Sequence, residues 1–125
     1  MQVNNLEKDL AIFMINRGFK ILFIPKEWID KEVAMYSIMK FPHNLRWLEE
    51  YSDDYDIVLA ALTKDPFTLT FASERLQKDK ELILKIIKIK PLAITLVNRK
   101  LFDAEFVKNI REIVPESIQY IFPYV

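Results

Sequence analysis

Carboxylate pairs recur along this sequence in a pattern that could support acid–base chemistry or bind a metal ion. Each pair has an aspartate and a second acid two positions later: Asp30/Glu32, Asp54/Asp56, Asp79/Glu81 and Asp103/Glu105. General acid–base catalysis needs two carboxylates that converge on one pocket with separated pKa values. A pair that returns at regular intervals is instead what helix capping predicts, because an N-cap aspartate and an acid in the first turn both stabilise the start of a helix. We therefore interpret these acids as structural.

The other residues capable of chemistry are few. His43 is the only histidine, and the chain contains no cysteine and a single glycine in 125 residues. A zinc site would have to be completed by carboxylates alone, no serine has a second base with which to form a triad, and a phosphate-binding loop lacks its glycines. Since no convergent polar constellation can be assembled, we expect a protein that is not an enzyme and has no metal ion and no cofactor.

A repeat positions these residues along the chain. Prolines occur at intervals of 24, 25 and 24 residues, and the aspartate of each acidic pair lies twelve residues before its proline: Pro42, Pro66, Pro91 and Pro115. Three residues after each proline the chain is apolar, and the same spacing carried backwards places Gly18 at the proline position. A fixed period of this length is typical of solenoids. The sequence predicts about five repeats, at approximately 5–28, 29–53, 54–78, 79–102 and 103–125.

Each repeat is predicted to be a helix–turn–helix unit. The first helix, helix A, begins at the capping aspartate and ends before the proline, which disfavours the α conformation of the preceding residue. The second, helix B, begins at the proline and runs for two to three turns, including the stretch 72–76. Segments 67–72 and 92–97 alternate apolar residues with threonine, which is also typical of a strand. The scarcity of turn glycines favours the helix.

The composition agrees with a folded domain. Hydrophobic residues make up 51% of the chain, enough for a core in a single domain spanning residues 1–125. Neither half of a repeat can bury its apolar face alone, so neighbouring repeats must stack. The expected fold is therefore all-α, a short α-solenoid or helical array. The longest early apolar stretch, residues 10–15, is far shorter than the roughly 20 residues of a membrane span, and we expect a cytoplasmic protein without a membrane partner.

The segment from Asp54 to Leu82 resembles a known kind of repeat. It lies within the stretch DYDIVLAALTKDPFTLTFASERLQKDKELIL, which is similar to uncharacterised short tandem α-helical repeats written D-x-E-hydrophobic, followed by A-S-E-x-L. Such repeats occur in protists, giant viruses and some intracellular bacteria. This chain departs from them at the inter-helix turn, where it has proline instead of asparagine–glycine. The resemblance implies a repeat fold and an interaction role, and it implies no catalytic residues.

Two surfaces are candidates for binding. The basic one lies in residues 75–100, which hold eight Lys or Arg against two acids, and its candidate residues are Lys78, Lys80, Lys85, Lys88, Arg99 and Lys100. The other combines aromatic and acidic residues at Trp47, Glu49, Glu50 and Tyr51. An aromatic cluster around it is interpreted as core and inter-repeat packing, part of which is an alternative binding anchor: Trp28, Phe41, Trp47, Tyr51 and Tyr55.

These observations predict a binding function. We expect a protein–protein interaction module, and the resemblance suggests a viral or parasite-type accessory or inhibitor protein that engages a host or defence component. The alternative is a nucleic-acid-associated protein that binds a phosphate backbone through the basic face. Eighteen basic and eighteen acidic residues cancel, which argues against a general polyanion binder. The sequence leaves the identity of the protein partner and the oligomeric state open.

Overall fold

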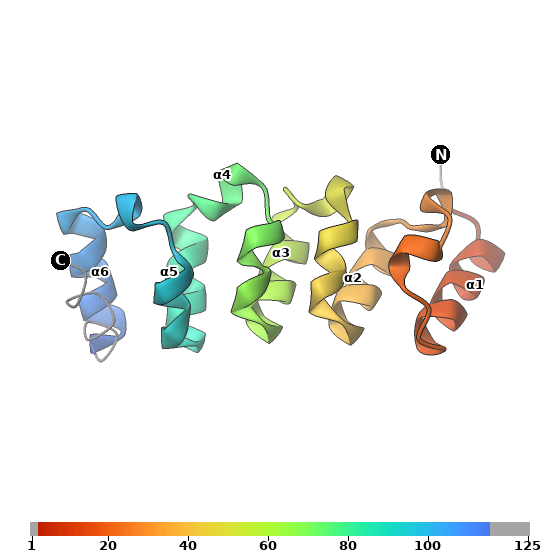
Figure 1. Cartoon of the computed structure of the whole chain (residues 1–125), viewed down its shortest axis with the longest axis horizontal. Coiled ribbons are helices and arrows are strands. Elements are labelled where there is room, and N and C mark those ends of the chain that lie inside the picture. The colour runs from red at the N-terminus through yellow and green to blue at the C-terminus, as the bar shows by residue number, and fades with distance from the viewer. Residues whose placement is uncertain (1–2, 116–125) are drawn as a thin grey trace.

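The computed structural model describes residues 3–115, and every regular element within that range is helical (Figure 1). The prediction of an all-α helical array is confirmed. Six α-helices are present in the described residues: α1 (Asn5–Asn16), α2 (Lys31–Lys40), α3 (Tyr55–Lys64), α4 (Glu74–Gln77), α5 (Lys80–Ile89) and α6 (Ala104–Ile113). Shorter 3-10 helices lie between them: η1 (Ile21–Phe23), η2 (Lys26–Trp28), η3 (Pro42–Trp47), η4 (Glu49–Tyr51), η5 (Pro66–Phe71), η6 (Pro91–Leu96) and η7 (Arg99–Leu101). None of these helices is long and apolar enough to cross a membrane.

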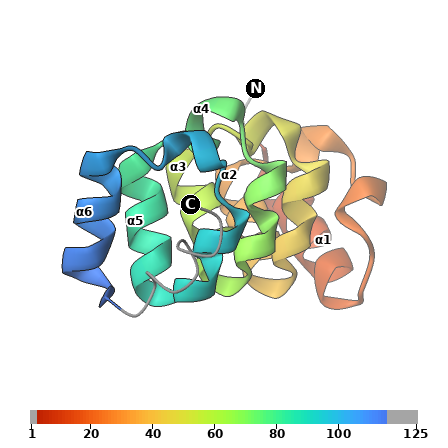
Figure 2. The same ribbon diagram turned by 60° about the vertical axis from the view of Figure 1, so that its left-hand side comes forward.

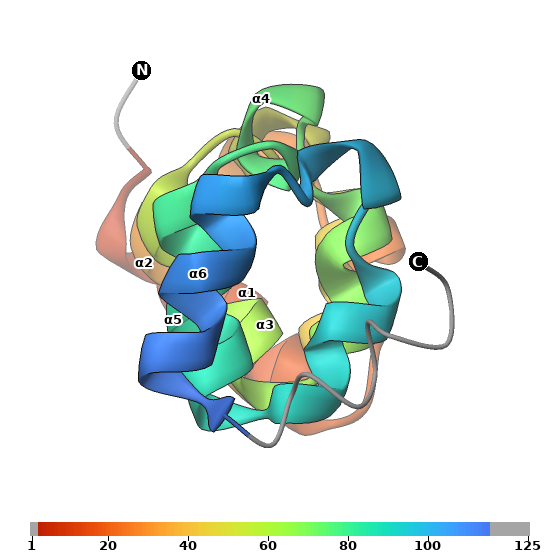
Figure 3. The same ribbon diagram turned by 90° about the vertical axis from the view of Figure 1, so that its left-hand side faces the viewer.

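The helices form two rows that run along the array. Helices A of the successive repeats are α1, α2, α3, α5 and α6, and each contacts the next (Figures 1 and 2). The 3-10 helices η3, η5 and η6 form the second row, and they also contact one another. Figure 3, which looks along the array, shows the helices A on one side and the second row on the other. The core lies between the rows.

Helices A begin where the sequence predicts. The side chain of each repeat aspartate accepts a hydrogen bond from the backbone N–H three residues later, with donor–acceptor distances of 2.9 Å for Asp30, 3.2 Å for Asp54, 3.1 Å for Asp79 and 2.8 Å for Asp103. Asn4 performs the same function for α1 in a capping box with Glu7. At the other end of α1, Gly18 has a φ of 85° and its N–H donates to the carbonyl of Ile15, so a left-handed turn ends this helix where the later repeats use proline.

Helix B differs from its prediction. It is a 3-10 helix of six residues in η3, η5 and η6, and neither 67–72 nor 92–97 forms a strand. The predicted helical continuation through 72–76 holds from Glu74 onward but is broken at the two residues before it. Ala72 and Ser73 are extended, and the N–H of Ser73 donates to the carbonyl of Ser52 at 2.8 Å instead of to its own helix. The side chain of Ser73 then caps the separate helix α4.

The core is built from equivalent positions of the repeats. The residue three positions after each capping aspartate is at most 1% exposed: Val33, Ile57, Leu82 and Phe106. The residue four positions further along is also fully or almost fully buried, and it is small in the first two of these repeats and large in the last two: Ser37, Ala61, Ile86 and Ile110. Each helix A therefore turns the same stripe inward, and different side-chain volumes fill the space between neighbouring repeats.

Candidate functional site

The acidic pairs serve as caps and as acceptors for lysines of the preceding repeat. Lys8 Nζ lies 2.9 Å from a carboxylate oxygen of Asp30 and 2.8 Å from one of Glu32. Lys31 Nζ lies 3.2 Å and 3.0 Å from the carboxylates of Asp54 and Asp56. The hydrogen bonds that Lys8 donates to Asp30 and Glu32 raise the pKa of Lys8, so this lysine stays charged. The carboxylates of these two pairs are therefore bound to a lysine of the preceding repeat.

These contacts between a lysine of one repeat and the acids at the start of the next helix A are here called the ladder. The ladder changes at the junctions that follow α3. Lys80 Nζ lies 2.7 Å from a carboxylate oxygen of Asp103. Tyr55 occupies the position that Lys31 and Lys80 hold in their helices, and its hydroxyl accepts a hydrogen bond from Lys85 Nζ at 2.9 Å. That hydrogen bond raises the pKa of Lys85. Asp79 caps α5. Among the described residues it is the one capping aspartate of a helix A that forms no ion pair with a lysine of the preceding repeat.

Asp79 is the position at which capping can be measured separately from the ladder. Asp79→Ala should lower the free energy of unfolding by about 1 kcal/mol, because the N–H of Leu82 loses its acceptor. Asp79→Asn retains an acceptor of similar capping strength and should stay within about 0.5 kcal/mol of the wild type. Urea unfolding followed by circular dichroism measures both. Equal losses in the two variants would show that charge, and not capping, is what Asp79 contributes.

His43 connects two repeats. Its Nε2 lies 2.7 Å from a carboxylate oxygen of Asp65, and its ring meets the ring of Phe71 edge-on with centroids 5.9 Å apart. Asp65 also accepts from the N–H of Phe67 at 2.9 Å, and the hydrogen bonds from His43 and Phe67 lower the pKa of Asp65. Among residues 3–115, no group of three or more His, Asp or Glu side chains is placed to hold a metal ion. The geometry of His43 is that of a link between neighbouring repeats.

The six predicted basic residues do not share one role. Lys78 pairs with Glu74 at 2.8 Å, while Lys80 and Lys85 belong to the ladder described above. Arg99 and Lys100 lie in η7, where the N–H of Lys100 donates to the side chain of Asn98. Lys88 is exposed in the last turn of α5. Three of the predicted cations therefore bind side chains of the protein itself.

The predicted aromatic and acidic residues come together in one open cleft. Its volume is about 340 Å³, and Trp47, Glu49, Glu50 and Tyr51 all line it. The remaining lining residues come from η3 and from the end of the preceding repeat: Leu22, Lys26, Ile29, Arg46 and Leu48. The cleft therefore lies between the segments that lead from the second row of helices into α2 and α3.

Equivalent positions of two successive repeats hold different residues, and this difference explains why the cleft is open at this junction. At the next junction Asp53 accepts hydrogen bonds from Ser73 Oγ at 2.5 Å and from Arg75 Nε at 2.9 Å, and these bonds join the two connecting segments. One repeat earlier, Ile29 takes the place of Asp53 and offers no carboxylate. At this junction the Tyr51 hydroxyl donates to the carbonyl of Ile29 at 3.4 Å. Glu49, at the position of Ser73, lines the cleft instead of bridging it.

The cleft combines an apolar floor with charges of both signs. Leu48 is buried, Ile29 and Tyr51 are half-buried, and Trp47 keeps 42% of its surface exposed. The guanidinium of Arg46 lies 4.9 Å from the centre of the Trp47 ring and holds one face of it. Glu49 and Glu50 form no ion pair within the described part of the chain, unlike Asp53, Asp54 and Asp56 of the same acidic run. Two carboxylates beside an exposed indole are thus available to a partner.

The wider aromatic cluster is divided between core and surface. Trp28, Tyr51 and Tyr55 are partly buried and pack against the core. Phe41 is 53% exposed, and Trp47 is the cleft residue described above. Core packing is thus confirmed for three members of the cluster, and a binding anchor at the exposed ones stays a prediction. The half of the cleft contributed by residues 22–29 was not predicted, although Ile29 in place of Asp53 is a signal in the sequence.

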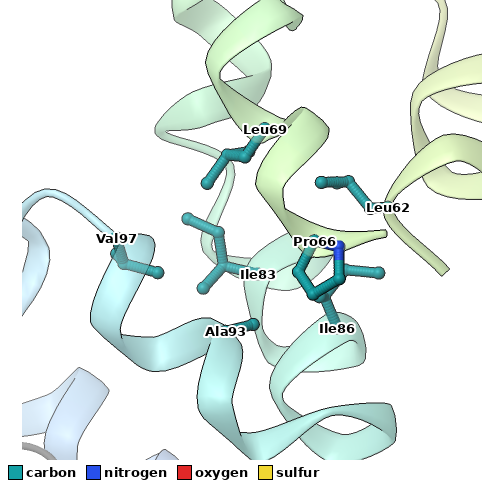
Figure 4. A pocket seen from close by; sticks show the side chains of 7 residues that line it. All are labelled: Leu62, Pro66, Leu69, Ile83, Ile86, Ala93 and Val97. Carbon is teal, nitrogen blue, oxygen red and sulfur yellow. The ribbon is translucent and has the colours of Figure 1, made fainter. Parts of the chain in front are cut away.

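A second hollow is too small to bind a ligand. It lies between α3, η5, α5 and η6 and measures about 10 Å³, which is about the space of one water molecule (Figure 4). The side chains that surround it are all apolar: Leu62, Pro66, Leu69, Ile83, Ile86, Ala93 and Val97. A water molecule there would have no polar side chain to bind, so we interpret this hollow as a packing gap between repeats.

The fold and the cleft define an array of α-helical repeats with an open groove between two of its repeats. Residues 54–102, from the cap of α3 through η7, match the model of a family described as a domain of unknown function (DUF4116). No curated protein and no solved structure matches the chain. The cleft lies outside the matched residues, between the two repeats that precede them.

Proposed function

We propose that this chain is a protein-interaction module that binds a short segment of another protein in the cleft beside Trp47. The observation that carries the proposal is an indole 42% exposed in a groove of about 340 Å³, next to two carboxylates without an internal ion pair. Exposed tryptophans set in apolar pockets are typical anchors of protein interfaces. The acids that cap the helices A already accept backbone hydrogen bonds, and we propose a binding function without a cofactor.

The chemistry of the cleft indicates what it would bind. Ile29, Leu48 and Trp47 favour an apolar side chain, and Glu49 and Glu50 favour a neighbouring lysine or arginine. Lys26 and Arg46 at the rim would disfavour a segment that is uniformly basic. The expected ligand is therefore a peptide with one aromatic or aliphatic anchor and a single basic residue close to it. The setting implied by the resemblance, an accessory protein that engages a host or defence component, belongs to the same proposal.

Selection from a random peptide library tests the proposal. Peptides selected on the wild type should contain the apolar anchor and the basic residue, and Trp47→Ala should weaken their binding roughly thirtyfold, the effect of losing a 2 kcal/mol hot spot. Trp28→Phe leaves Trp47 as the sole tryptophan, so its fluorescence should shift when a selected peptide is added. Phe67→Ala is the matched control, because Phe67 is 60% exposed and is not among the residues that line the cleft. Peptides that bind Trp47→Ala as tightly as the wild type would overturn the proposal.

The phosphate-backbone alternative is distinguished by its own measurement. Lys88 and Lys100 are exposed and form no ion pair within the described residues. If the basic face binds nucleic acid, labelled duplex or single-stranded DNA should bind the wild type with a steep dependence on salt. Lys88→Glu combined with Lys100→Glu should abolish that binding, while Trp47→Ala should leave it unchanged. This result would favour the alternative over the cleft.

A further inference from the structure

The turns that join each helix A to its helix B carry exposed apolar side chains. Four of these turns lie in the described residues, at 15–20, 39–44, 63–68 and 88–93, and the turn after α6 extends beyond them. Six large apolar residues in the four turns keep 50–60% of their surface exposed: Phe19, Met39, Phe41, Phe67, Ile89 and Leu92. Single exposed apolar residues are ordinary on a protein surface, whereas a set that recurs from turn to turn indicates a contact surface.

The four turns lie along one edge of the array, here called the turn edge. Figures 1 and 3 show them at the lower ends of α1, α2, α3 and α5, on the side opposite α4. Each of these helices contacts the next one in the row, so the turns follow one another along the edge. Their exposed side chains can therefore meet one extended surface at the same time.

Charge distinguishes the turn edge from the opposite edge. The four turns contain one acid, Asp65, which lies 2.7 Å from His43, and six basic residues: Arg17, Lys20, Lys40, Lys64, Lys88 and Lys90. The opposite edge consists of the segments that lead from each helix B into the next helix A. These segments, at 26–32, 49–56, 73–81 and 98–105, hold thirteen of the eighteen acids. The two edges are therefore opposite in sign, although the net charge of the chain is zero.

Helix stability explains only part of this arrangement. Lys40, Lys64 and Lys88 lie in the last turns of their helices, where the negative end of the helix dipole favours a cation. The dipole gives no reason for an exposed apolar residue such as Phe41 beside them. Lys20, Lys64 and Lys88 form no ion pair within the described part of the chain. Their charges are thus available to an anionic partner.

Apolar side chains interleaved with lysines along one edge match the surface of a bilayer that contains anionic lipid. The apolar side chains would enter the boundary between headgroups and acyl chains, while the lysines extend toward the headgroup phosphates. The negative surface potential attracts the turn edge and repels the opposite edge, so it would also orient the molecule. A single-stranded nucleic acid is the other polyanion to consider. Its bases stack on aromatic side chains, and Met39, Ile89 and Leu92 offer none.

We propose that this chain binds the surface of an anionic bilayer through the turn edge and lies on the membrane without crossing it. Surface binding of this kind needs no spanning helix. The proposal departs from the sequence-based expectation of no membrane partner, which considered only a spanning segment. The cleft beside Trp47 lies between segments of the opposite edge, so it would stay open to a peptide while the turn edge is on the membrane.

Sedimentation with phospholipid vesicles tests this proposal. The wild type should bind vesicles of phosphatidylcholine and phosphatidylserine, and it should not bind vesicles of phosphatidylcholine alone. Lys20→Glu combined with Lys64→Glu should weaken the binding roughly tenfold or more, because two attractive charges become repulsive. Phe41→Ser combined with Phe67→Ser should weaken it without changing the charge. Lys100→Glu combined with Lys108→Glu is the matched control, since it makes the same change in net charge away from the turn edge and should retain most of the binding.

The contrary results are equally definite. A wild type that does not bind the anionic vesicles would overturn the proposal, and so would undiminished binding by the Lys20→Glu and Lys64→Glu double variant. Binding of labelled single-stranded DNA instead of vesicles would assign the turn edge to nucleic acid and overturn it as well. Circular dichroism checks that the variants keep the helical fold. Peptide binding in the cleft should be the same in the double variant and the wild type, so this test is independent of the proposed function.

A dye at a single position tests the orientation, and the chain is suited to it because it contains no cysteine. Phe67→Cys labelled with a dye that brightens in apolar surroundings should gain fluorescence on anionic vesicles, since position 67 would enter the interface. The same dye on Lys100→Cys, at the opposite edge, should not respond. A response at position 100 and none at position 67 would show that the opposite edge meets the membrane, and it would overturn the proposal.

Discussion

Replacing Phe106 by alanine should lower the free energy of unfolding by about 3–5 kcal/mol, the usual effect of truncating a buried aromatic side chain. Phe106 is 1% exposed and is the largest side chain that is fully buried in the described residues. It lies in the first turn of α6, where its ring stacks on that of Phe102 with centroids 5.9 Å apart and lies 5.5 Å from the ammonium of Lys80. Alanine would lose these contacts and leave a cavity between α5 and α6.

Urea unfolding measures this loss, and the chain offers a control of the same chemistry. Phe67 is 60% exposed, so Phe67→Ala should change the free energy of unfolding by no more than about 0.5 kcal/mol. Because each repeat contacts only its neighbours, Phe106→Ala should also increase amide exchange in α6 more than in α2. If the two variants were equally stable, α6 would not be packed against the array through Phe106.

Local signals in the sequence predicted the helices A well. An aspartate cap, an acid in the first turn, an apolar stripe and a proline all lie within one repeat, and each acts on the backbone beside it. Asp54 and Asp79 cap their helices for this reason. The first repeat was harder to interpret, since Asn4 caps α1 and Gly18 ends it, so both ends use residues that differ from those of the later repeats.

Helix B could not be predicted to the same detail because contacts between repeats decide it. The break at Ser73 results from its backbone bond to Ser52 and its side-chain bond to Asp53, both about 20 residues away in the sequence. The alternation of apolar residues and threonine in η5 is also typical of a strand, although the scarcity of turn glycines favoured a helix. In the structure Thr68 is buried and its hydroxyl donates to the carbonyl of Asp65, a local bond that satisfies it without a sheet.

The candidate site was half predictable. Trp47, Glu49, Glu50 and Tyr51 are adjacent in the sequence, so their composition identified them. The other wall of the cleft, including Leu22 and Ile29, comes from the preceding repeat. The sequence shows that the six basic residues are close together along the chain, but it does not show what each one contacts. Lys80 binds Asp103 and Lys85 binds Tyr55, and both contacts depend on how neighbouring repeats stack.

Leu76→Ala should lower the free energy of unfolding by about 2–5 kcal/mol. Leu76 is 0% exposed, although it belongs to α4, a helix of only four residues. A single turn is not stable by itself in water, so tertiary contacts must hold it. The contacts available are the burial of Leu76, the cap by Ser73 and the hydrogen bonds of Ser73 and Arg75 to Asp53. Removing the buried side chain should also release these bonds, because α4 would no longer be fixed.

Leu101 provides the comparison for this prediction. It is the equivalent residue one repeat later, 25 positions along, and it is half-buried in η7. Leu101→Ala should therefore cost less than Leu76→Ala, in proportion to the apolar area that each side chain removes from water. Amide exchange distinguishes the two further: Leu76→Ala should expose the N–H groups of Ser73 and Leu76 to solvent, whereas Leu101→Ala should leave both protected. The contrary result would be an equal loss of unfolding free energy in both variants, with the N–H of Ser73 protected in each. In that case the hydrogen bonds of Ser73 and Arg75 to Asp53 would hold α4 without the burial of Leu76.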